Sequence, residues 1–376
     1  MRRLLPAILA LFIAAPASAQ SFHSVDAVVE RGIRRGIYPG AVVVIGNRDS
    51  VLHARGYGHL TWSRSSPVPT PDSTLFDLAS LTKVVATTSA AMVLVEEGRL
   101  GLDRPIAEYL PGYGGNGRER ITVRMLLDHT SGLRPFLRFY EAPDRGSAIE
   151  MLYAVEPQWL PGAAVQYSDL NALLLGMVVE AASGEQLERF VEGRVFEPLE
   201  MTQTGFLPSR TEARRTAPSS RYYGMPVAGR ASDPNTAIFG GVAGHAGLFS
   251  TGMDLARYAR MWLGKGMVPG GERVLAGATI NTFLTGGTEA GARLLGWDRP
   301  DRSNDDPGTF GLLVSTSTYG HTGWTGTQMW IDPERNLYVV FLTNRSFQPR
   351  ARRSLTALSD VRATLADTVV RVMGRM

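Results

Sequence analysis

The chain has 376 residues and not one cysteine. Without cysteine there is no disulfide bond, no zinc–thiolate site and no cysteine nucleophile. If the protein is exported, burial of apolar side chains must hold its fold together in place of disulfides. With 44% hydrophobic and 20% charged residues, the composition is that of an ordinary globular protein rather than a disordered or fibrous one.

Clusters that would hold a metal, a nucleotide or a nucleic acid are also missing. The six histidines show no HxxxH or related ligand spacing, so no metal site is expected. Acidic and basic residues are interspersed, and no block of lysine and arginine indicates a nucleic-acid partner. The glycine-rich stretch GGVAGHAG (240–247) has no Lys-Ser/Thr pair and runs into GLFST rather than a helix, which is not typical of a phosphate-binding loop. No cofactor is predicted.

Long apolar runs are scarce, and the one that stands out opens the chain. MRRLLPAILALFIAAPASAQ has a basic start, an apolar run from Leu4 to Ala15 and a small-x-small end at residues 17–19, which is the pattern of a secretory signal peptide. The alternative is an uncleaved membrane anchor, but the run is shorter than the roughly 18 residues that a span needs. We therefore expect cleavage before Gln20, no stable membrane span afterwards, and a periplasmic or secreted protein.

Lysine is nearly absent, since only Lys83 and Lys265 are lysines among 39 basic residues. Arginine serves as the surface cation throughout, so surface charge does not explain why Lys83 stands three residues after Ser80 in DLASLTKVVATTSAAMVLVEEG (77–98). A group that gains and loses a proton explains it better, because lysine changes its charge when buried and arginine does not.

The order of the segments predicts strands at both ends of the chain and helices between them. Residues 41–58 read as a hairpin with a turn at 47–50, TQMWIDP and NLYVVFLTN as two further strands, and residues 354–374 as a closing amphipathic helix. A buried helix is expected from Ser80 to Glu97, ending at Gly98. Further helices are expected at 25–35, 123–127, 147–155, 169–182, 187–195 and 253–262.

This order favours an α/β (α+β) fold, in which strands from both chain termini form one antiparallel sheet flanked by helices and an all-helical region is inserted between them. We expect a single catalytic domain over residues 20–376. Its sheet region would comprise residues 22–75 and 255–376, and its inserted helical region residues 76–254.

Ser80 and Lys83 have the spacing of a nucleophile and its base. A serine hydroxyl needs a base within hydrogen-bond reach to attack a carbonyl, and residues three apart share one face of a helix. Burial would lower the pKa of Lys83, so that a neutral amine could take the serine proton. If Ser80 begins the helix, free backbone N–H groups would favour the negative charge that develops on the reacting oxygen.

Two later segments strengthen this hypothesis: WLPGAAVQYSDLN around Tyr167 and YGHTGWTGTQMWIDPE around His321. Together with Ser80-Leu81-Thr82-Lys83, they make the chain resemble the serine penicillin-recognising superfamily in its class C branch, which holds class C β-lactamases, D-alanyl-D-alanine carboxypeptidases and related esterases. ITVRMLLDHTSGL (121–133), FEPLEMTQTGF (196–206) and GGVAGHAGLFST (240–251) are similar to recurring segments of that family. The resemblance spans roughly residues 25–345 and implies a β-lactamase/transpeptidase-like fold.

The resemblance implies a role for each matching residue. Ser80 would be the acylated nucleophile, and Lys83 and Tyr167 would share the base and acid duties. The backbone N–H groups of Ser80 and Trp324 would form the oxyanion hole, and His321-Thr322-Gly323 would edge the site on a strand.

Asp169 and His321 depart from the family pattern. The family has Asn at the position of Asp169, and a carboxylate cannot donate the hydrogen bond that an amide offers to a substrate carbonyl. Asp169 near Lys83 would favour the ammonium form, which makes a Tyr167 phenolate the better base. His321 replaces lysine, as in the peptidase and esterase members, and carries full positive charge only below a pKa of about 6.5. Trp324 adds an aromatic wall.

Other chemically suggestive residues have simpler explanations. His129 in DHTSGL ends a helix, where histidine often satisfies terminal carbonyls, and Ser131 lacks the G-x-S-x-G pattern of a nucleophile. His245 is a candidate pocket residue. The aromatic residues Phe136, Phe139 and Tyr140 either line a pocket or pack within a loop, and packing is the interpretation that we favour.

The sequence thus predicts an exported serine hydrolase with a small-molecule or peptidoglycan-type substrate: a D-amino acid peptide, an ester or a β-lactam. D,D-carboxypeptidase-like or esterase-like activity is the first hypothesis, and a class C-like β-lactamase is the alternative within the enzymes. The alternative of another class is a non-catalytic penicillin-binding or sensory protein, which would bind a β-lactam without turning it over.

Overall fold

The computed structural model describes residues 22–222, 225–268, 270–271, 273–287, 293–301, 307–347 and 355–375. The signal peptide predicted over residues 1–19 lies outside these ranges. Within them, no helix combines the length and the apolar character needed to cross a membrane.

The centre of the fold is a five-stranded antiparallel sheet with the strand order β2-β1-β10-β9-β8. Its strands are β1 (Gly40–Gly46), β2 (Val51–Gly58), β8 (Tyr319–Thr322), β9 (Gln328–Asp332) and β10 (Leu337–Thr343). β1 and β2 form the predicted hairpin, and β1 pairs with β10 in a register that sets Val43 opposite Phe341. Strands from both termini therefore share one sheet, as predicted.

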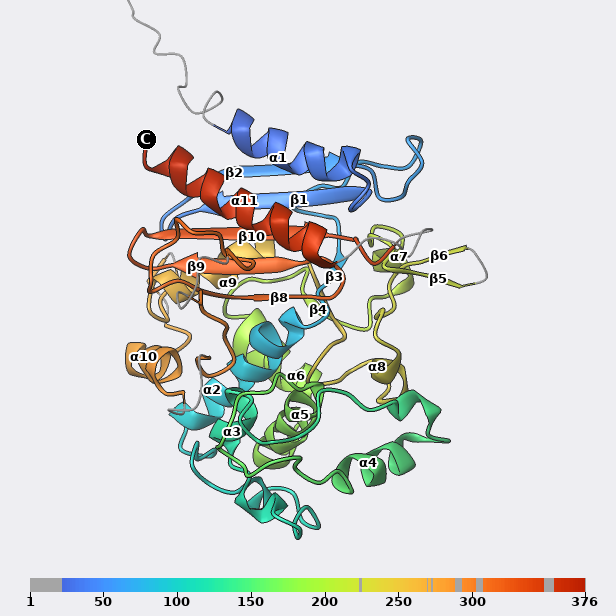
Figure 1. The fold of residues 1–376 in the computed structure, drawn as a ribbon, viewed down its shortest axis with the longest axis vertical. Helices are drawn as coiled ribbons and strands as arrows, with labels where there is room; N and C mark the ends of the chain where they lie inside the picture. Colours follow the sequence, from blue (N-terminus) through green and yellow to red (C-terminus); the bar gives the residue numbers. More distant parts are fainter. Residues whose placement is uncertain are drawn as a thin grey trace, which may run out of the picture.

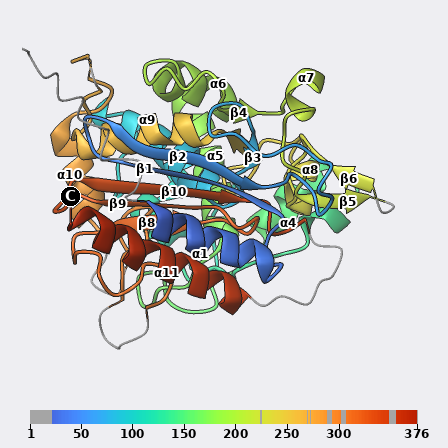
Figure 2. The same ribbon diagram turned by 90° about the horizontal axis from the view of Figure 1, so that it is seen from above.

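Both faces of this sheet are covered, because alternate side chains of a strand point to opposite faces. The side chains of Val43 and Ile45 on β1 lie in one core with α1 (His23–Arg34) and α11 (Leu355–Met373). Those of Val42 and Val44 lie in a second, larger core with α9 (Gly252–Leu263) and the helical region. Figures 1 and 2 show α1 and α11 side by side over one face, with the remaining helices beyond the other. This explains why every residue of β1 is buried.

The helical region lies between β2 and β8 in the chain, so it extends past the predicted boundary at residue 254, and because it contains short strands it is not all-helical as predicted. Its α-helices are α2 (Ser89–Glu96), α3 (Val123–Leu127), α4 (Arg145–Tyr153), α5 (Asp169–Ser183), α6 (Leu187–Val191), α7 (Arg210–Ala213), α8 (Pro234–Ile238) and, after α9, α10 (Gly277–Thr285). Short strands pair as β3 (Phe76–Asp77), β7 (Leu248–Ser250) and β4 (Gly205–Phe206), and as β5 (Ser220–Tyr222) with β6 (Met225–Val227). Single-turn 3₁₀ segments occupy Ile106–Glu108, Arg118–Arg120 and Phe139–Glu141.

Two predicted helices contain π-helical turns. The helix expected after Ser80 runs as a π-helix over Lys83–Thr88 and continues as α2, and the helix expected at 187–195 is α6 followed by a π-helix over Glu192–Phe196. Such wide turns are uncommon and occur often at functional sites. The predicted end at Gly98 is confirmed, because this residue has the left-handed φ of 68° typical of a glycine after a helix C-cap.

Gly98 allows a test of this helix end. A Cβ at Gly98 would meet nothing within 4 Å, so Gly98→Ala should cost only the left-handed backbone strain, about 1 kcal/mol of unfolding free energy. The matched control is Gly193→Ala. A Cβ at Gly193 would also meet nothing within 4 Å, but Gly193 lies inside the π-helix Glu192–Phe196 and its φ is not positive. It should be neutral or stabilising by up to about 1 kcal/mol. Urea denaturation of both variants would contradict the assignment if both lost stability equally.

Candidate active site

Ser80 lies in the turn between β3 and the π-helix, and Asp77 shapes that turn. Ala79 has a left-handed φ of 48°, which is rare for a residue with a side chain. Its N–H donates to Asp77 Oδ1 at 2.9 Å, and the other carboxylate oxygen accepts the Ser232 N–H at 2.7 Å. Burial raises the pKa of Asp77, although these hydrogen bonds act in the opposite direction. The carboxylate thus connects the serine turn to Ser232, which together with Asp233 lines the cavity.

Lys83 lies within hydrogen-bond distance of Ser80 and is only 3% exposed. Its Nζ donates to Ser80 Oγ at 2.9 Å and to Asp169 Oδ1 at 2.7 Å. Burial by itself would lower the pKa of Lys83, but the charges of Tyr167 and Asp169 and hydrogen bonding to both raise it overall. The neutral amine expected from burial alone is therefore wrong, and the ammonium form expected from a nearby Asp169 is the one that the structure supports, because an ammonium that faces a carboxylate keeps its proton.

Tyr167 lies in the segment that precedes α5, and its ring is next to Lys83. The Lys83 Nζ lies 4.8 Å from the centroid of its ring, and the ring centroid of His321 is 5.9 Å away on another side. The side chain is 37% exposed and lines the cavity. The phenol therefore lies between the buried ammonium and the space in which a substrate would bind.

His129 holds the Tyr167 segment in place. Its ring lies 4.7 Å from that of Tyr167, and its Nδ1 accepts from the Ser168 N–H at 3.2 Å and lies 3.0 Å from Asn171 Nδ2. Burial, with nearby positive charges, lowers the pKa of His129 well below its ordinary value. Sequence analysis predicted that His129 would bind the carbonyl groups at a helix end. Instead, its side chain accepts a hydrogen bond from Ser168, the N-cap of α5, and so fixes the start of that helix.

His321 lies on β8, at the edge of the sheet, and is 2% exposed. Its Nδ1 lies 2.8 Å from the carbonyl oxygen of Thr322, to which it donates, and its Nε2 has no partner among the described residues. Burial lowers the pKa of His321 to about 4, and the charges of Arg293 and Lys83 act in the same direction. The ordinary value of about 6.5 expected from the sequence is therefore too high, and His321 is neutral at physiological pH.

A cavity of about 760 Å³ joins these groups. Its lining includes Ser80, Tyr167, Asp169 and residues 321–324. Lys83 is buried next to the cavity and donates to Ser80 and Asp169. His245, expected as a pocket residue, also lines it. The aromatic residues of segment 136–140 have different surroundings. Phe136 lines the cavity, whereas Phe139 is buried against Phe239, which agrees with the packing interpretation.

The cavity also includes residues that the sequence did not reveal: Asp233, Arg293, Asp298 and Arg362. Asp233 Oδ1 lies 3.0 Å from His245 Nε2. Arg362 comes from the middle of α11, on the opposite side of the sheet from most of the helical region, and its Nη2 donates to the carbonyl oxygens of Gly323 and Thr327. None of these residues belongs to a recognisable motif.

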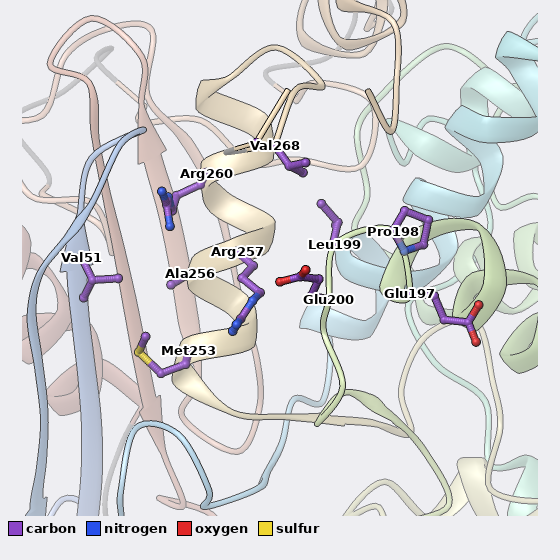
Figure 3. A pocket seen from close by; sticks show the side chains of 11 residues that line it. Val51, Glu197, Pro198, Leu199, Glu200, Met253, Ala256, Arg257, Arg260 and Val268 are labelled. Atoms are coloured by element: carbon purple, nitrogen blue, oxygen red, sulfur yellow. The ribbon is translucent and has the colours of Figure 1, made fainter. Parts of the chain in front are cut away.

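A second cavity, of about 540 Å³, lies elsewhere in the molecule. Figure 3 shows it between α9 and residues 197–200, with Arg257, Arg260 and Glu200 among its lining side chains. Arg260 is engaged by the carbonyl oxygens of Arg48 and Asp49. No residue expected to be catalytic lies there, so the cavity at Ser80 is the candidate active site.

Known proteins share this architecture. The family model described as Beta-lactamase matches residues 25–362. An Escherichia coli K12 protein named "Putative D-alanyl-D-alanine carboxypeptidase" is 31% identical over 84% of this chain and 80% of its own length. A Bacillus subtilis protein named N-acetylmuramyl-L-alanine amidase is 31% identical over 88% of this chain and 82% of its own.

Solved structures agree in fold. A penicillin-binding protein homologue from Caulobacter crescentus superposes with a TM-score of 0.72 at 20% identity, covering 94% of this chain and 98% of its own. The hydrolase EstCE1 gives a TM-score of 0.71 at 21% identity, over 92% and 99% of the two chains. The chain belongs to the beta-lactamase family and is a serine hydrolase, as the sequence motifs predicted.

The burial of His321 predicts a pH-dependent stability. The unfolded chain binds a proton at this histidine below about pH 6.5, whereas the folded chain binds it only near pH 4. Between these values the unfolded state holds more protons, so the free energy of unfolding falls as the pH falls, by up to about 1.4 kcal/mol per pH unit for one histidine. Denaturation of His321→Gln from pH 7.5 to 4.5 should show a shallower fall than wild type. Parallel curves would contradict the assignment.

Proposed function

We propose that this protein is an exported hydrolase that works through an acyl-enzyme on Ser80, with D,D-carboxypeptidase-like or esterase-like activity. The observation that carries the proposal is the buried Lys83 ammonium, held between Ser80 Oγ at 2.9 Å and Asp169 at 2.7 Å beside Tyr167. A cation in this position orients the serine hydroxyl and stabilises a phenolate next to it.

In the proposed acylation step, the Tyr167 phenolate removes the proton of Ser80 as Oγ attacks the substrate carbonyl. Lys83 remains an ammonium, because it donates to Ser80 and to Asp169 and has no free lone pair in that state. When the tetrahedral intermediate collapses, the Tyr167 hydroxyl gives its proton to the leaving group. The phenolate is thereby restored for the deacylation step, in which it activates water against the ester.

The charge on the tetrahedral oxygen requires two donors. The N–H groups of Ser80 and Trp324 donate to no acceptor among the described residues, whereas the neighbouring Gly323 N–H is engaged by the Thr327 carbonyl at 2.8 Å. We assign Ser80 and Trp324 as the oxyanion hole, since free backbone donors in a closed site stabilise developing negative charge.

Several features bear on the substrate and the compartment. The Escherichia coli relative is named a D-alanyl-D-alanine carboxypeptidase and the Bacillus subtilis relative an N-acetylmuramyl-L-alanine amidase, which supports the peptidoglycan-type substrate expected from the sequence. The signal-type segment at residues 1–19 supports export to the periplasm or the medium. A β-lactam would acylate the same serine, and β-lactamase activity depends on how fast that ester is hydrolysed.

Intact mass spectrometry tests the nucleophile. Mixing the protein with a labelled penicillin, and separately with p-nitrophenyl esters, should add one acyl group to wild type and none to Ser80→Ala, because that variant has no hydroxyl to acylate. The matched control is Ser359→Ala, another serine of the cavity, which should still be acylated.

The lifetime of the adduct separates the alternatives. Fast nitrocefin turnover would favour the β-lactamase hypothesis, and a stable adduct with every substrate would favour a sensory protein. An adduct that persists in Ser80→Ala would contradict the proposal itself.

Asp169→Asn tests the division of roles between Lys83 and Tyr167. The amide keeps the shape but removes the negative charge, so the ammonium should lose its proton more easily. The alkaline limb of the kcat/KM profile should move to lower pH by about 1 to 3 units, so the loss of activity relative to wild type should grow as the pH rises above 8. Asp360→Asn, an exposed change on α11, should have no effect. An unchanged profile in Asp169→Asn would show that the carboxylate does not set the charge of Lys83.

A further inference from the structure

Asp233 is a carboxylate of the cavity that none of the proposed chemical steps uses. It is the N-cap of α8, where its Oδ1 accepts from the Thr236 N–H at 3.0 Å and from the Thr236 hydroxyl at 3.3 Å. The same oxygen lies 3.0 Å from His245 Nε2. The other oxygen, Oδ2, accepts from no donor among the described residues, and the side chain is 22% exposed in the lining of the cavity. The protein thus fixes one oxygen of this carboxylate and leaves the other available to a ligand.

His245 holds Asp233 in this orientation. Its side chain is 2% exposed, and its Nδ1 is buried without a partner in the described part of the chain. A proton on Nδ1 would have no acceptor there, and burying such a donor is costly. The ring proton therefore belongs on Nε2, which donates it to Asp233. Burial raises the pKa of Asp233, but the hydrogen bonds from His245 and Thr236 lower it overall. A neutral ring thus orients a carboxylate that keeps its charge.

The glycine-rich segment GGVAGHAG (240–247) places His245 against Asp233. A Cβ at Gly244 would lie 2.0 Å from the carbonyl oxygen of Ala172 on α5, so only glycine allows this close approach. The Thr87 hydroxyl, on the π-helix that begins at Lys83, donates to the Gly244 carbonyl at 2.7 Å. These contacts fix the segment between two elements of the candidate active site.

Two other carboxylates line the cavity, and a permanent cation already offsets the charge of each. Asp169 pairs with Lys83 at 2.7 Å, and Asp298 pairs with Arg293. Asp233 pairs with no lysine or arginine in the ranges that the structure describes. A positively charged group that enters the cavity therefore meets an uncompensated negative charge at Asp233, and a carboxylate forms its strongest hydrogen bonds with charged donors.

We propose that Asp233 binds an ammonium group of the substrate and that the preferred substrates carry a free amine on their acyl part. This inference rests on the proposed function, in which Tyr167 protonates the leaving group. The Lys83 Nζ and the Arg293 guanidinium lie 4.8 and 5.3 Å from the centroid of the Tyr167 ring. An ammonium on the leaving group would approach these two like charges, so the amine that Asp233 binds belongs to the acyl group.

Matched pairs of p-nitrophenyl esters test the proposal. The esters of Nα-acetyl-D-lysine and Nα-acetyl-D-norleucine differ only in the terminal ammonium, and the ornithine and norvaline pair places that ammonium one methylene closer to the ester. Wild type should prefer the charged member of at least one pair by about tenfold or more in kcat/KM, as expected for a hydrogen bond between charged groups.

Asp233→Asn should abolish this preference. The amide oxygen can still accept from Thr236 and cap α8, since Asn is as good an N-cap as Asp, but the negative charge is gone. The matched control is Asp144→Asn, the same change at the exposed N-cap of α4, where Asp144 accepts from the Ser147 N–H at 2.8 Å. This control should keep the preference.

Three outcomes would overturn the proposal. They are the absence of a preference for either charged ester in wild type, a preference that persists in Asp233→Asn, and equal losses on the charged and neutral esters in that variant. Equal losses would mean that Asp233 only supports the shape of the cavity.

A binding measurement separates this proposal from the proposed function. In Ser80→Ala, calorimetry with the amides of the same amino acids should show tighter binding of the charged than of the neutral member, and Ser80→Ala/Asp233→Asn should lose that difference. If the charged amide binds through Asp233 but wild type forms no Ser80 adduct, the proposed function fails and the ammonium site stands. If Ser80 is acylated equally by both members of each pair, the proposed function stands and the ammonium site fails.

Discussion

The candidate active site depends on one buried charge, the ammonium of Lys83. Taking an ammonium out of water costs several kcal/mol unless an opposite charge and hydrogen bonds replace the water. Asp169 at 2.7 Å and Ser80 at 2.9 Å do so. Asp169 is also the first residue of α5, where the partial positive charge of a helix N-terminus stabilises a carboxylate. Several parts of the fold therefore have to be in register before Lys83 can be buried as a cation.

The fold meets this requirement by joining three elements at one edge of the sheet. The π-helix brings Lys83, the N-terminus of α5 brings Asp169 next to Tyr167, and β8 brings His321 and Thr322. Hydrogen bonds fix each element to its neighbours: Thr327 Oγ1 donates to the Leu78 carbonyl next to the serine turn, and His129 accepts from the start of α5. Geometry of this kind is rigid, because the connecting groups are themselves buried and paired.

Charge in the cavity is distributed in a way that residue types alone do not indicate. Histidine at position 321 is neutral because it is buried and borders two cations, so it serves as a hydrogen-bonding group and not as a charge. Two arginines also line the cavity: Arg293, which pairs with Asp298, and Arg362, which donates to the carbonyl oxygens of Gly323 and Thr327. An arginine keeps its charge when buried, whereas histidine and lysine respond to their surroundings.

The sequence by itself determined the main elements of the fold and the candidate groups of the site. Alternation and helical periodicity located the hairpin at β1 and β2, the helix after Ser80 and its end at Gly98, and the three motifs identified Ser80, Tyr167 and His321 as partners. These signals are local, since they depend on neighbours along the chain. Only the tertiary structure decided the neutrality of His321 and the presence of Arg293 and Arg362 in the cavity. Burial and the distance to charges on remote segments set these properties, and no spacing along the chain records either quantity.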